Sequence, residues 1–465
     1  MGLPKKVQDV LDEWNVEYQV AEKASLLVRS PVLNMSELSE NSAQLSFLED
    51  TNGRIQVIFP ANRILDLKKI STLTAREFTP SSPDKVEKIR HKLNLEAIPA
   101  LPQVTGLETY VDEHLLGLDH ITMELSDDQQ LQIPIADFQT LVSSARIGDY
   151  SSEVPTLLLP GTQWNNKDVT QINSAVQNFT QLRIHQRLEE TLDMPPMPET
   201  AQRIIDLRMD PEAETEELAK LVEHDPGLAA QVISWANSPY YGVAGVIGNV
   251  EDAVIRVLGF DLVINLALGL SLGRTLSVPK EGPQGYTPFW QQSVYTAAMM
   301  AEMVRAMPPK QRPSQGMAYL CGLLHNFGYL LLGHVFPPHF KMVNQHVESN
   351  PQMNRYYIEQ HLLGLTREQI SSNLFKQWGL PDEVCTAIRY QNEPSYKGEH
   401  SMLSQMLYMS SRMLRQHNLN DAPLESLPEA LENSLNLNMD KAKDGLERVL
   451  DSKDELQEMA RQLTG

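Results

Sequence analysis

Two adjacent polar residues, His325 and Asn326, interrupt an otherwise apolar run from Leu320 to Tyr329. An imidazole beside a second polar side chain can ligate a metal or transfer a proton. The simpler interpretation is a core or groove histidine with a local hydrogen bond, and this is the one that we favour. The pair is nevertheless the first place in this chain where chemistry could occur.

Several motifs accompany this pair in a characteristic order. They are Met194-Pro-Pro-Met-Pro-Glu199, the segment Glu216 to Pro226, Asn237-Ser-Pro-Tyr-Tyr-Gly242 and the segment Ala253 to Gly259. The run around His325 resembles the helix of the HD phosphohydrolase superfamily, in which His followed by Asp binds a divalent metal. Together the motifs resemble the HDOD family, from about residue 184 to residue 395. The resemblance implies an all-α domain with a site built around His325.

The chain departs from a working HD site at nearly every ligand position. The carboxylate that would follow His325 is replaced by the neutral amide of Asn326. The resemblance implies a groove at the former metal position, lined by residues of which one alone is a family ligand: Gln292, His325, Asn326, Arg367, Tyr390 and Gln391.

These replacements predict a binding site without a metal. A hard divalent cation needs anionic oxygens or several imidazoles to replace its hydration shell. Arg367 would add a positive charge where the metal should lie, and without a metal nothing lowers the pKa of an attacking water. We therefore expect no catalytic residue, no metal and no cofactor, and we expect the groove to bind protein partners or a small anionic ligand in signal transduction.

The N-terminal part has a resemblance of its own. The segments Val57 to Ile70, Ala75 to Glu77 and Thr109 to Glu113 resemble the YbaK/prolyl-tRNA editing domain, an aminoacyl-tRNA deacylase fold. The lysine that the family pattern places in the second strand aligns here with Gln44.

The Gly-x-x-Pro element of that family is altered as well. It appears as Glu96-Ala-Ile-Pro99, with a side chain where glycine lets backbone amides approach a substrate. The resemblance thus implies a degenerate editing site at Gln44, Glu96 and Pro99, in a domain used for binding or regulation.

The alternative is an enzyme. An aminoacyl-tRNA deacylase would need a replacement for the missing lysine, and Lys68 and Lys69 are the first candidates to test. A metal-dependent phosphohydrolase is the less favoured form. Residues 1 to 155 contain about 14 basic and 24 acidic residues, which is a poor balance for gripping a phosphate backbone. Nucleic acid is therefore an unlikely partner, and tRNA is kept as the alternative.

The fold class that we predict is multi-domain. Short β-like runs at residues 44–48, 54–59, 109–111 and 131–135 favour an α+β domain over residues 1–147. A segment rich in Gly, Pro, Asn and Ser predicts a linker at 148–183, and helical periodicity then favours an all-α domain over 184–396. Apolar residues spaced among charges predict an amphipathic helical extension over 397–465.

Composition places limits on location and partners. The net charge of −21 disfavours polyanions and anionic membrane surfaces. Cys321 and Cys385 are too few for a disulfide framework, and the N-terminus has no apolar stretch of signal-peptide length. We expect a soluble protein of a bacterial cytoplasm that has no membrane partner.

Three other patterns favour structural roles over chemistry. Met299, Met300, Met303 and Met307 predict an apolar core face. Gly269-Leu-Ser-Leu-Gly273 matches the serine-hydrolase pattern, but it lies in a helical run, where its glycines predict close helix contact. A third group consists of histidines, which we interpret as surface or interface residues rather than metal ligands: His334, His339, His346 and His361.

Overall fold

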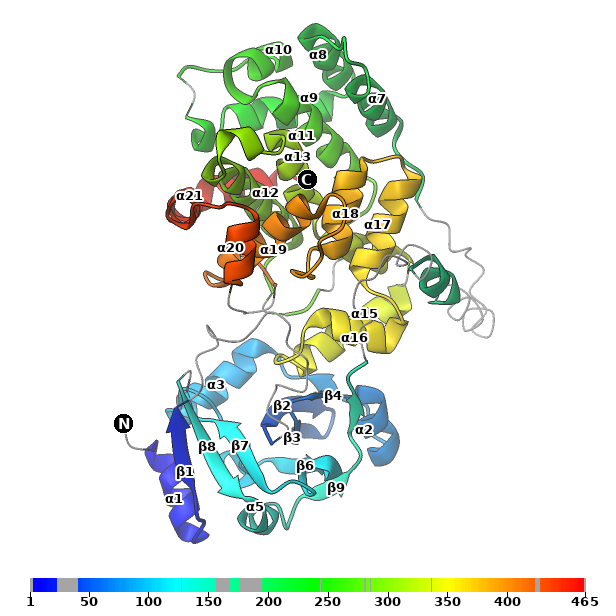
Figure 1. Ribbon diagram of the computed structural model, residues 1–465. Coiled ribbons are helices and arrows are strands. Elements are labelled where there is room, and N and C mark those ends of the chain that lie inside the picture. The colour runs from blue at the N-terminus through cyan, green and yellow to red at the C-terminus, as the bar shows by residue number, and fades with distance from the viewer. Residues whose placement is uncertain are drawn as a thin grey trace. The chain divides into compact units, whose positions relative to one another are not determined.

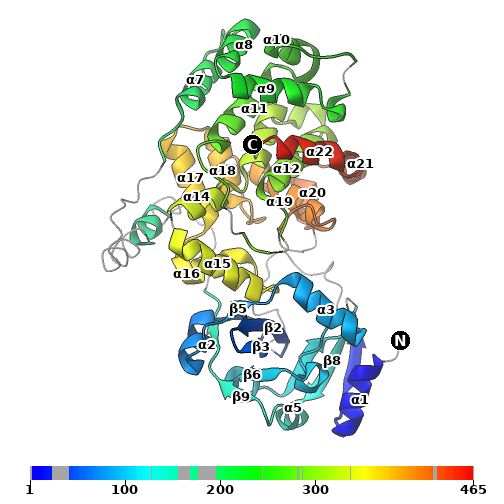
Figure 2. The ribbon, with the colours of Figure 1, turned by 180° about the vertical axis from the view of Figure 1, so that it is seen from behind.

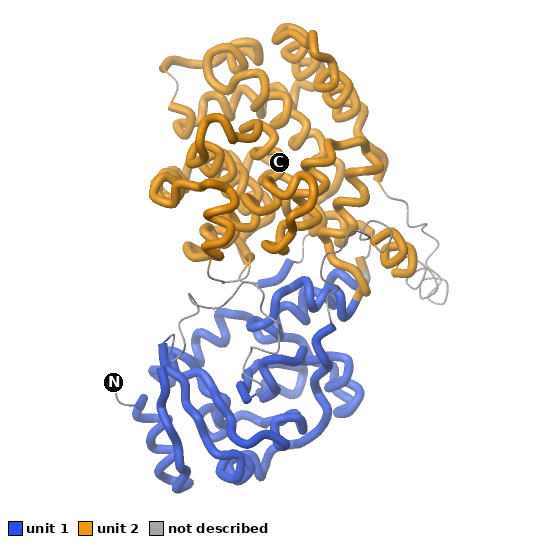
Figure 3. Tube along the Cα trace, in the orientation of Figure 1, with its two compact units in different colours: residues 1–157, 281–285, 338–362 blue, residues 158–280, 286–337, 363–465 orange. Residues whose placement is uncertain are grey.

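The computed structural model describes residues 3–22, 41–126, 128–155, 168–175, 195–242, 244–279, 282–284, 286–335, 337–422 and 427–463. The chain divides into two compact units (Figure 3). The first comprises residues 1–157, 281–285 and 338–362, and the second comprises residues 158–280, 286–337 and 363–465. The first contains the strands and the second is helical, which confirms the predicted fold class.

The first unit is built on a twisted five-stranded sheet (Figure 1) in the order β5-β2-β3-β6-β9. Its centre is an antiparallel hairpin of β2 (Ala43–Asp50) and β3 (Gly53–Pro60), and β3 pairs in parallel with β6 (Glu108–Asp112). The turn of the hairpin needs Gly53, because φ is 134° there and Asp50 Oδ1 accepts the Asn52 and Gly53 N–H groups. The sequence therefore specifies this register locally.

The remaining strands of this unit form two smaller sheets. Buried apolar side chains form two separate core clusters, and neighbouring residues of β3 and β6 contribute alternately to the two. The other elements are β1 (Gln19–Glu22), β4 (Arg63–Leu65), β5 (Thr79–Pro80), β7 (His120–Glu124), β8 (Gln129–Pro134), β9 (Arg146–Gly148), β10 (Ser151–Glu153), α1 (Lys5–Glu13), α2 (Leu67–Thr74), α3 (Pro83–Leu93), α4 (Pro102–Thr105), η3 (Glu113–Leu115) and α5 (Ile135–Leu141).

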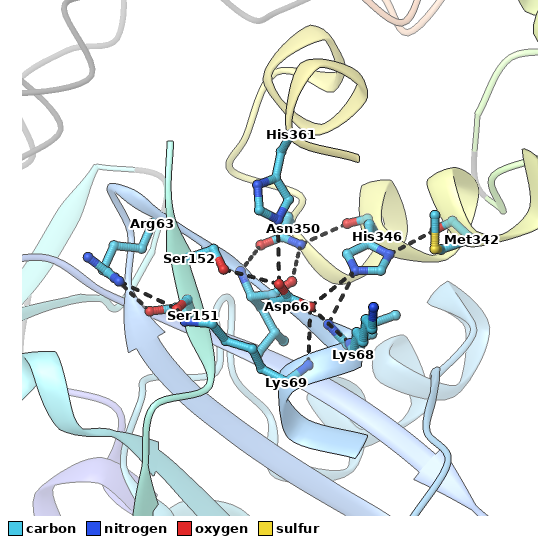
Figure 4. Close-up of polar contacts among 12 residues, drawn as sticks. Arg63, Asp66, Lys68, Lys69, Ser151, Ser152, Met342, His346, Asn350 and His361 are labelled. Atoms are coloured by element: carbon cyan, nitrogen blue, oxygen red, sulfur yellow. Dashed lines mark hydrogen bonds and ion pairs between the residues drawn. The ribbon is translucent and has the colours of Figure 1, made fainter. Parts of the chain in front are cut away.

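Two helices that follow much later in the sequence complete the first unit: α15 (Pro337–Ser349) and α16 (Arg355–Leu363). Figure 4 shows how they attach to β4 and α2. The Asn350 amide bonds both backbone groups of Leu65, at 2.7 Å to N and 3.1 Å to O. His346 Nδ1 donates to the Met342 carbonyl, so its Nε2 is left to accept the Leu67 N–H at 3.2 Å. These are main-chain contacts, and they hold α15 in a defined register.

Asp66 is the centre of the same contact region. It caps α2 by accepting the Lys68 and Lys69 N–H groups, and it also accepts from Ser152 and lies 3.4 Å from His361 Nε2. The nearby imidazoles and backbone donors, which outweigh burial, hold the pKa of the Asp66 carboxyl far below its usual range. His346 and His361 thus serve contacts within the first unit.

The division into compact units differs from the predicted domain boundaries at these two helices. Their sequence lies inside the stretch predicted as the all-α domain, yet residues 338–362 belong to the first compact unit. The physical reason is that His346 of α15 and Asn350 just after it, one turn apart, both bond backbone atoms beside Asp66. Periodicity reports that a segment is helical but not which core it joins.

The second unit surrounds three helices with little exposed surface: α11 (Phe260–Gly273), α12 (Phe289–Ala306) and α13 (Gln315–Leu324). The outer helices are α7 (Glu199–Arg208), α8 (Thr215–Glu223), α9 (Pro226–Ala236), α10 (Val250–Ala253), α14 (Phe327–Val335), α17 (Arg367–Gln377), α18 (Asp382–Tyr390), α19 (Ser401–Arg415), α20 (Glu429–Ser434), α21 (Met439–Asp451) and α22 (Lys453–Arg461). Short η segments are Pro239–Tyr241, Val254–Leu258 and Pro309–Gln311.

None of the described helices is long and apolar enough to cross a membrane.

Close helix contacts explain two of the sequence patterns. The four methionines of α12 and its C-terminal end are at most 2% exposed, so they form core, as predicted. A side chain added at Gly269 would lie 2.6 Å from Leu323 Cδ2 of α13, and one at Gly273 would overlap the Trp290 ring. The Gly-x-Ser-x-Gly match is thus a contact surface between helices. Figure 2 shows the tail helices α21 and α22 beside α12, which they contact.

Candidate functional site

Arg367 and Asn326 meet where two helices begin. Asn326 lies just before α14, and Arg367 is the first residue of α17, whose start is fixed by a capping box between Thr366 and Gln369. Arg367 Nη1 donates to Asn326 Oδ1 at 3.1 Å, and its guanidinium lies 5.3 Å from the centroid of the Tyr329 ring. A cation therefore lies beside the residue that replaces the HD aspartate.

His325 ends α13 with both ring nitrogens facing partners. Nδ1 donates to the Gly322 carbonyl at 2.7 Å, because a carbonyl can only accept. Nε2 is therefore the acceptor, and the Asn420 amide lies 3.5 Å from it. Gln391 Nε2 donates to the His325 carbonyl at 2.8 Å. These contacts match the favoured interpretation of His325 as a locally bonded core histidine.

Asn420 and Asp421 were missed by the sequence analysis. The Asn420 amide also donates to Thr296 Oγ1 at 3.0 Å, and Asp421 accepts from Gln292 Nε2, which donates to the Thr287 carbonyl at 2.7 Å as well. Both residues lie after α19 in a stretch that reads only as a turn. The signal that could have found them is an Asn-Asp pair in a chain segment that returns to the helical core.

The structure brings five of the six predicted groove positions into one network. His325, Asn326, Arg367 and Gln391 are linked pairwise by the bonds above, and Gln292 joins through Asp421. Tyr390 is separate and stacks on Tyr396 with ring centroids 3.8 Å apart. The six are at most 9% exposed. That they bind a partner stays a prediction.

The donor chemistry here does not fit a divalent metal. His325 is the one residue of the network with an imidazole, and Asp421 is its one carboxylate. Within the described ranges, one group of three His, Cys, Asp or Glu ligand atoms lies close enough for a shared ion, and it is in the first unit: Asp112, His114 and Asp149. Those atoms already have protein partners, since Asp112 accepts from His114 and the Tyr150 N–H while Asp149 pairs with Lys69. We derive no metal-dependent step.

A buried ion pair lies next to the network, and its arginine, Arg389, lies in the last turn of α18. Arg389 donates to both carboxylate oxygens of Asp168, at 2.6 and 3.1 Å, and Gln369 donates to Asp168 at 2.9 Å. Asp168 and Arg389 are 7% and 6% exposed. Residues 168–175 are helical and belong to the second unit, so part of the predicted linker is anchored in the helical core.

Glu393 gives this region a pH dependence. Burial raises the pKa of its carboxyl to about 7, against the opposing effect of Arg389 at 3.1 Å. A raised pKa means that the folded state prefers the protonated form, so stability is fully present below the unfolded pKa of about 4.3 and falls as pH rises through 7. Glu393→Gln should therefore stabilise the helical unit by about 2 kcal/mol at pH 8, after allowance for partial exposure.

The same substitution should have little effect at pH 4, where the wild-type carboxyl is already protonated in both states. Urea unfolding at the two pH values, followed by circular dichroism, measures the difference. An equal effect of Glu393→Gln at both pH values would contradict the raised pKa.

One of the three degenerate editing positions of the first unit lines a cavity of about 220 Å³. Gln44 of β2 lines it, and so do Ile98 and Ala100, which flank the buried Pro99. Glu96 is exposed and does not line it. Lys68 and Lys69 of α2 are also absent from its walls, and Lys69 pairs with Asp149 at 2.8 Å. Lys68 and Lys69 thus do not replace the lysine that the family pattern requires.

Comparison with known proteins identifies the family of the helical part of the chain. The model of the HDOD domain matches residues 194–394. A crystal structure from Marinobacter aquaeolei VT8, described as a candidate signal transduction protein, is 39% identical and covers all of both chains with a TM-score of 0.87. The chain belongs to the HDOD family. The HDOD match begins at residue 194 and so excludes the β-containing region.

Two further proteins are similar to this chain at lower sequence identity. An HDOD domain protein of unknown function from Geobacter sulfurreducens is 22% identical, covers 62% of this chain and 96% of its own, and has a TM-score of 0.47. An uncharacterized protein of Treponema pallidum (strain Nichols) is 22% identical over 241 residues, which are 51% of this chain and 45% of that protein. The chain thus spans about half the length of this curated relative. The YbaK resemblance of the N-terminal unit stays a prediction.

Proposed function

We propose that this HDOD protein is a non-catalytic component of cytoplasmic signal transduction, which acts by binding a protein partner or a small ligand. The observation that carries the proposal is the bonded network at the former metal position, where Arg367 donates to Asn326 and Gln391 donates to the His325 backbone. The similar Marinobacter protein, described as a candidate for signal transduction, supports the same class of function.

The chemistry of the network explains why binding is the better proposal. Hydrolysis of a phosphate ester in an HD site needs a metal to polarise the phosphate and activate water. Here the Asn326 amide carries no charge, and the cationic Arg367 would repel a second cation nearby. A guanidinium among neutral amides instead suits an anionic group, whether on a protein or on a small ligand. Loss of anion binding in Arg367→Ala, with retention in Arg367→Lys, would support that detail.

Metal addition should leave the helical unit unchanged. Protein purified without chelator is expected to contain no stoichiometric metal, and Mn²⁺, Mg²⁺, Fe²⁺ or Zn²⁺ should not raise its melting temperature, because a ligand raises stability only if it binds the folded state. Elemental analysis and thermal melting measure both. A stoichiometric metal that is lost in His325→Ala would reverse the proposal and bring the phosphohydrolase to the front.

The competing function is aminoacyl-tRNA deacylation by the first unit. The cavity beside Gln44 favours it to the extent that a small acyl group could enter, but its described walls include no lysine. Incubation with a panel of aminoacyl-tRNAs decides between the two functions. Cleavage above the uncatalysed rate would make the first unit an enzyme and would leave the proposal for the HDOD domain untouched.

A further inference from the structure

The cavity of the first unit has a wall that the N-terminal resemblance does not include. Glu348 and Pro351, from α15 and the turn after it, line it together with residues of β2 and α3. His346 and Asn350 fix α15 to the backbone beside β4 (Figure 4), so the position of Glu348 is set by main-chain contacts. Glu348 is therefore a built part of the cavity.

Glu348 brings a negative charge that its hydrogen bond to a backbone N–H does not balance. Its Oε1 accepts the Gln284 N–H at 2.8 Å, and no described Lys or Arg lies within ion-pair distance of it. Burial raises the pKa of this carboxyl, which is the response expected of a charge that has lost water without gaining a cation. A bound cation would remove that cost.

The other charged groups of the cavity leave the balance negative. Arg90 is the one basic residue among its walls, and its guanidinium is held by the Glu87 carboxylate and donates to the Glu96 carbonyl at 2.9 Å. The charge of Arg90 is therefore already matched, and the Glu348 carboxylate favours a positive ligand.

The rest of the wall is suited to a small apolar group. Leu45, Phe47, Val86, Ile98 and Ala100 line the cavity beside the hydroxyl groups of two serines. Its volume of about 220 Å³ corresponds to roughly seven waters at about 30 Å³ each, which restricts the occupant to a small molecule. A few polar groups on an otherwise apolar wall are the usual composition of a small-molecule site.

We propose that this cavity binds a small organic cation, an ammonium group with a short branched alkyl substituent, with Glu348 as the counter-charge and the β2–α3 wall as the apolar contact. The proposal goes beyond the function of the HDOD domain and does not depend on it. Residues 338–362 leave the helical unit in sequence and return to it, so a ligand held by Glu348 would strengthen the attachment of this segment to the first unit.

The test uses isoamylamine, which is a cation at pH 7, and isoamyl alcohol, which has nearly the same shape without the charge. Calorimetric titration of the full-length protein should show the amine binding wild type roughly tenfold to a hundredfold more tightly than Glu348→Gln, as a bond to a charged group implies. The alcohol should bind both proteins equally. Glu77→Gln is the control, because Glu77 is an exposed carboxylate of the same unit that does not line the cavity.

Three results would overturn the proposal. They are an absence of amine binding to wild type, equal amine affinity in wild type and Glu348→Gln, and an equal loss of affinity in Glu77→Gln, which would indicate a diffuse charge effect. The comparison of amine with alcohol in wild type needs no variant, so it remains decisive if Glu348→Gln melts early. None of these results bears on the metal experiment with the HDOD domain.

Discussion

Arg389→Ala should lose about 3–5 kcal/mol of folding stability in the helical unit, the largest loss expected for a single substitution considered for this chain. Arg389 is 6% exposed and neutralises Asp168 through two hydrogen bonds and Glu393 through one. Truncation would leave the Asp168 carboxylate in a poorly solvated position without a cation, whereas Glu393, whose pKa is already raised to about 7, would take up a proton. The loss therefore comes mainly from the charge left behind and not from the bonds themselves.

Denaturant unfolding followed by far-ultraviolet circular dichroism measures this loss. Adding Asp168→Asn to Arg389→Ala should restore part of it, because the double variant no longer contains the unpaired Asp168 carboxylate. The control is Arg256→Ala, an arginine of the same unit whose side chain is 44% exposed and pairs with Asp252 at 3.7 Å. It should change stability by less than about 1 kcal/mol. A similar small effect of Arg389→Ala would mean that Asp168 does not depend on this pair.

The same ion pair shows why the linker was only partly predictable. The predicted linker, residues 148–183, includes β10, which pairs with β4 in the first unit, and its parts at 156–167 and 176–183 lie outside the described residues. Residues 168–175, however, are fixed by Asp168 bonding to Arg389 and Gln369, which lie about 200 positions further along the chain. Local composition contains no information about a partner at that distance.

Features determined by neighbouring residues were predicted well. The strands at 44–48, 54–59 and 109–111 correspond to β2, β3 and β6, and Asp225 caps the helix that Pro226 begins, with the Leu228 N–H donating at 3.0 Å. The strand expected at 131–135 is β8, which ends at Pro134. Alternation, turn residues and capping act within a few positions, so they can be recognised without the fold.

That the residues named from the family motifs form a binding site stays a prediction. The structure shows contacts between some of them, since Arg367 bonds Asn326 and Gln391 bonds the His325 carbonyl. What the motifs could not reveal is that Asn420 and Asp421 return to bond His325 and Gln292. Such a closure depends on how α19 and the chain after it pack, and substitution at ligand positions reports only that the metal ligands are gone.

Gly322→Ala should destabilise the helical unit by about 3 kcal/mol or more, because α12 and α13 touch through their backbones. An added Cβ would lie 2.5 Å from Ala297 Cα and 2.7 Å from Ala297 N, and backbone atoms of a buried helix cannot rotate away. The helices would have to separate. Since Thr296 and His325 lie on these two helices, the variant should also loosen their shared contact with Asn420.

Gly269→Ala is the matched control, since this buried helical glycine faces α13 through side chains and not through backbone. Its added Cβ would meet Leu323 Cδ2 at 2.6 Å and Leu320 Cδ1 at 3.2 Å, and both are ends of flexible side chains. The helix propensity gained by alanine offsets about 1 kcal/mol of that crowding, so the net change should stay within about 1 kcal/mol of wild type. Thermal and urea unfolding of the two variants compare them directly. If both glycines tolerate alanine equally, the α12–α13 contact must be loose enough to shift, and the network that closes the former metal position would then rest on α17 and α18 instead.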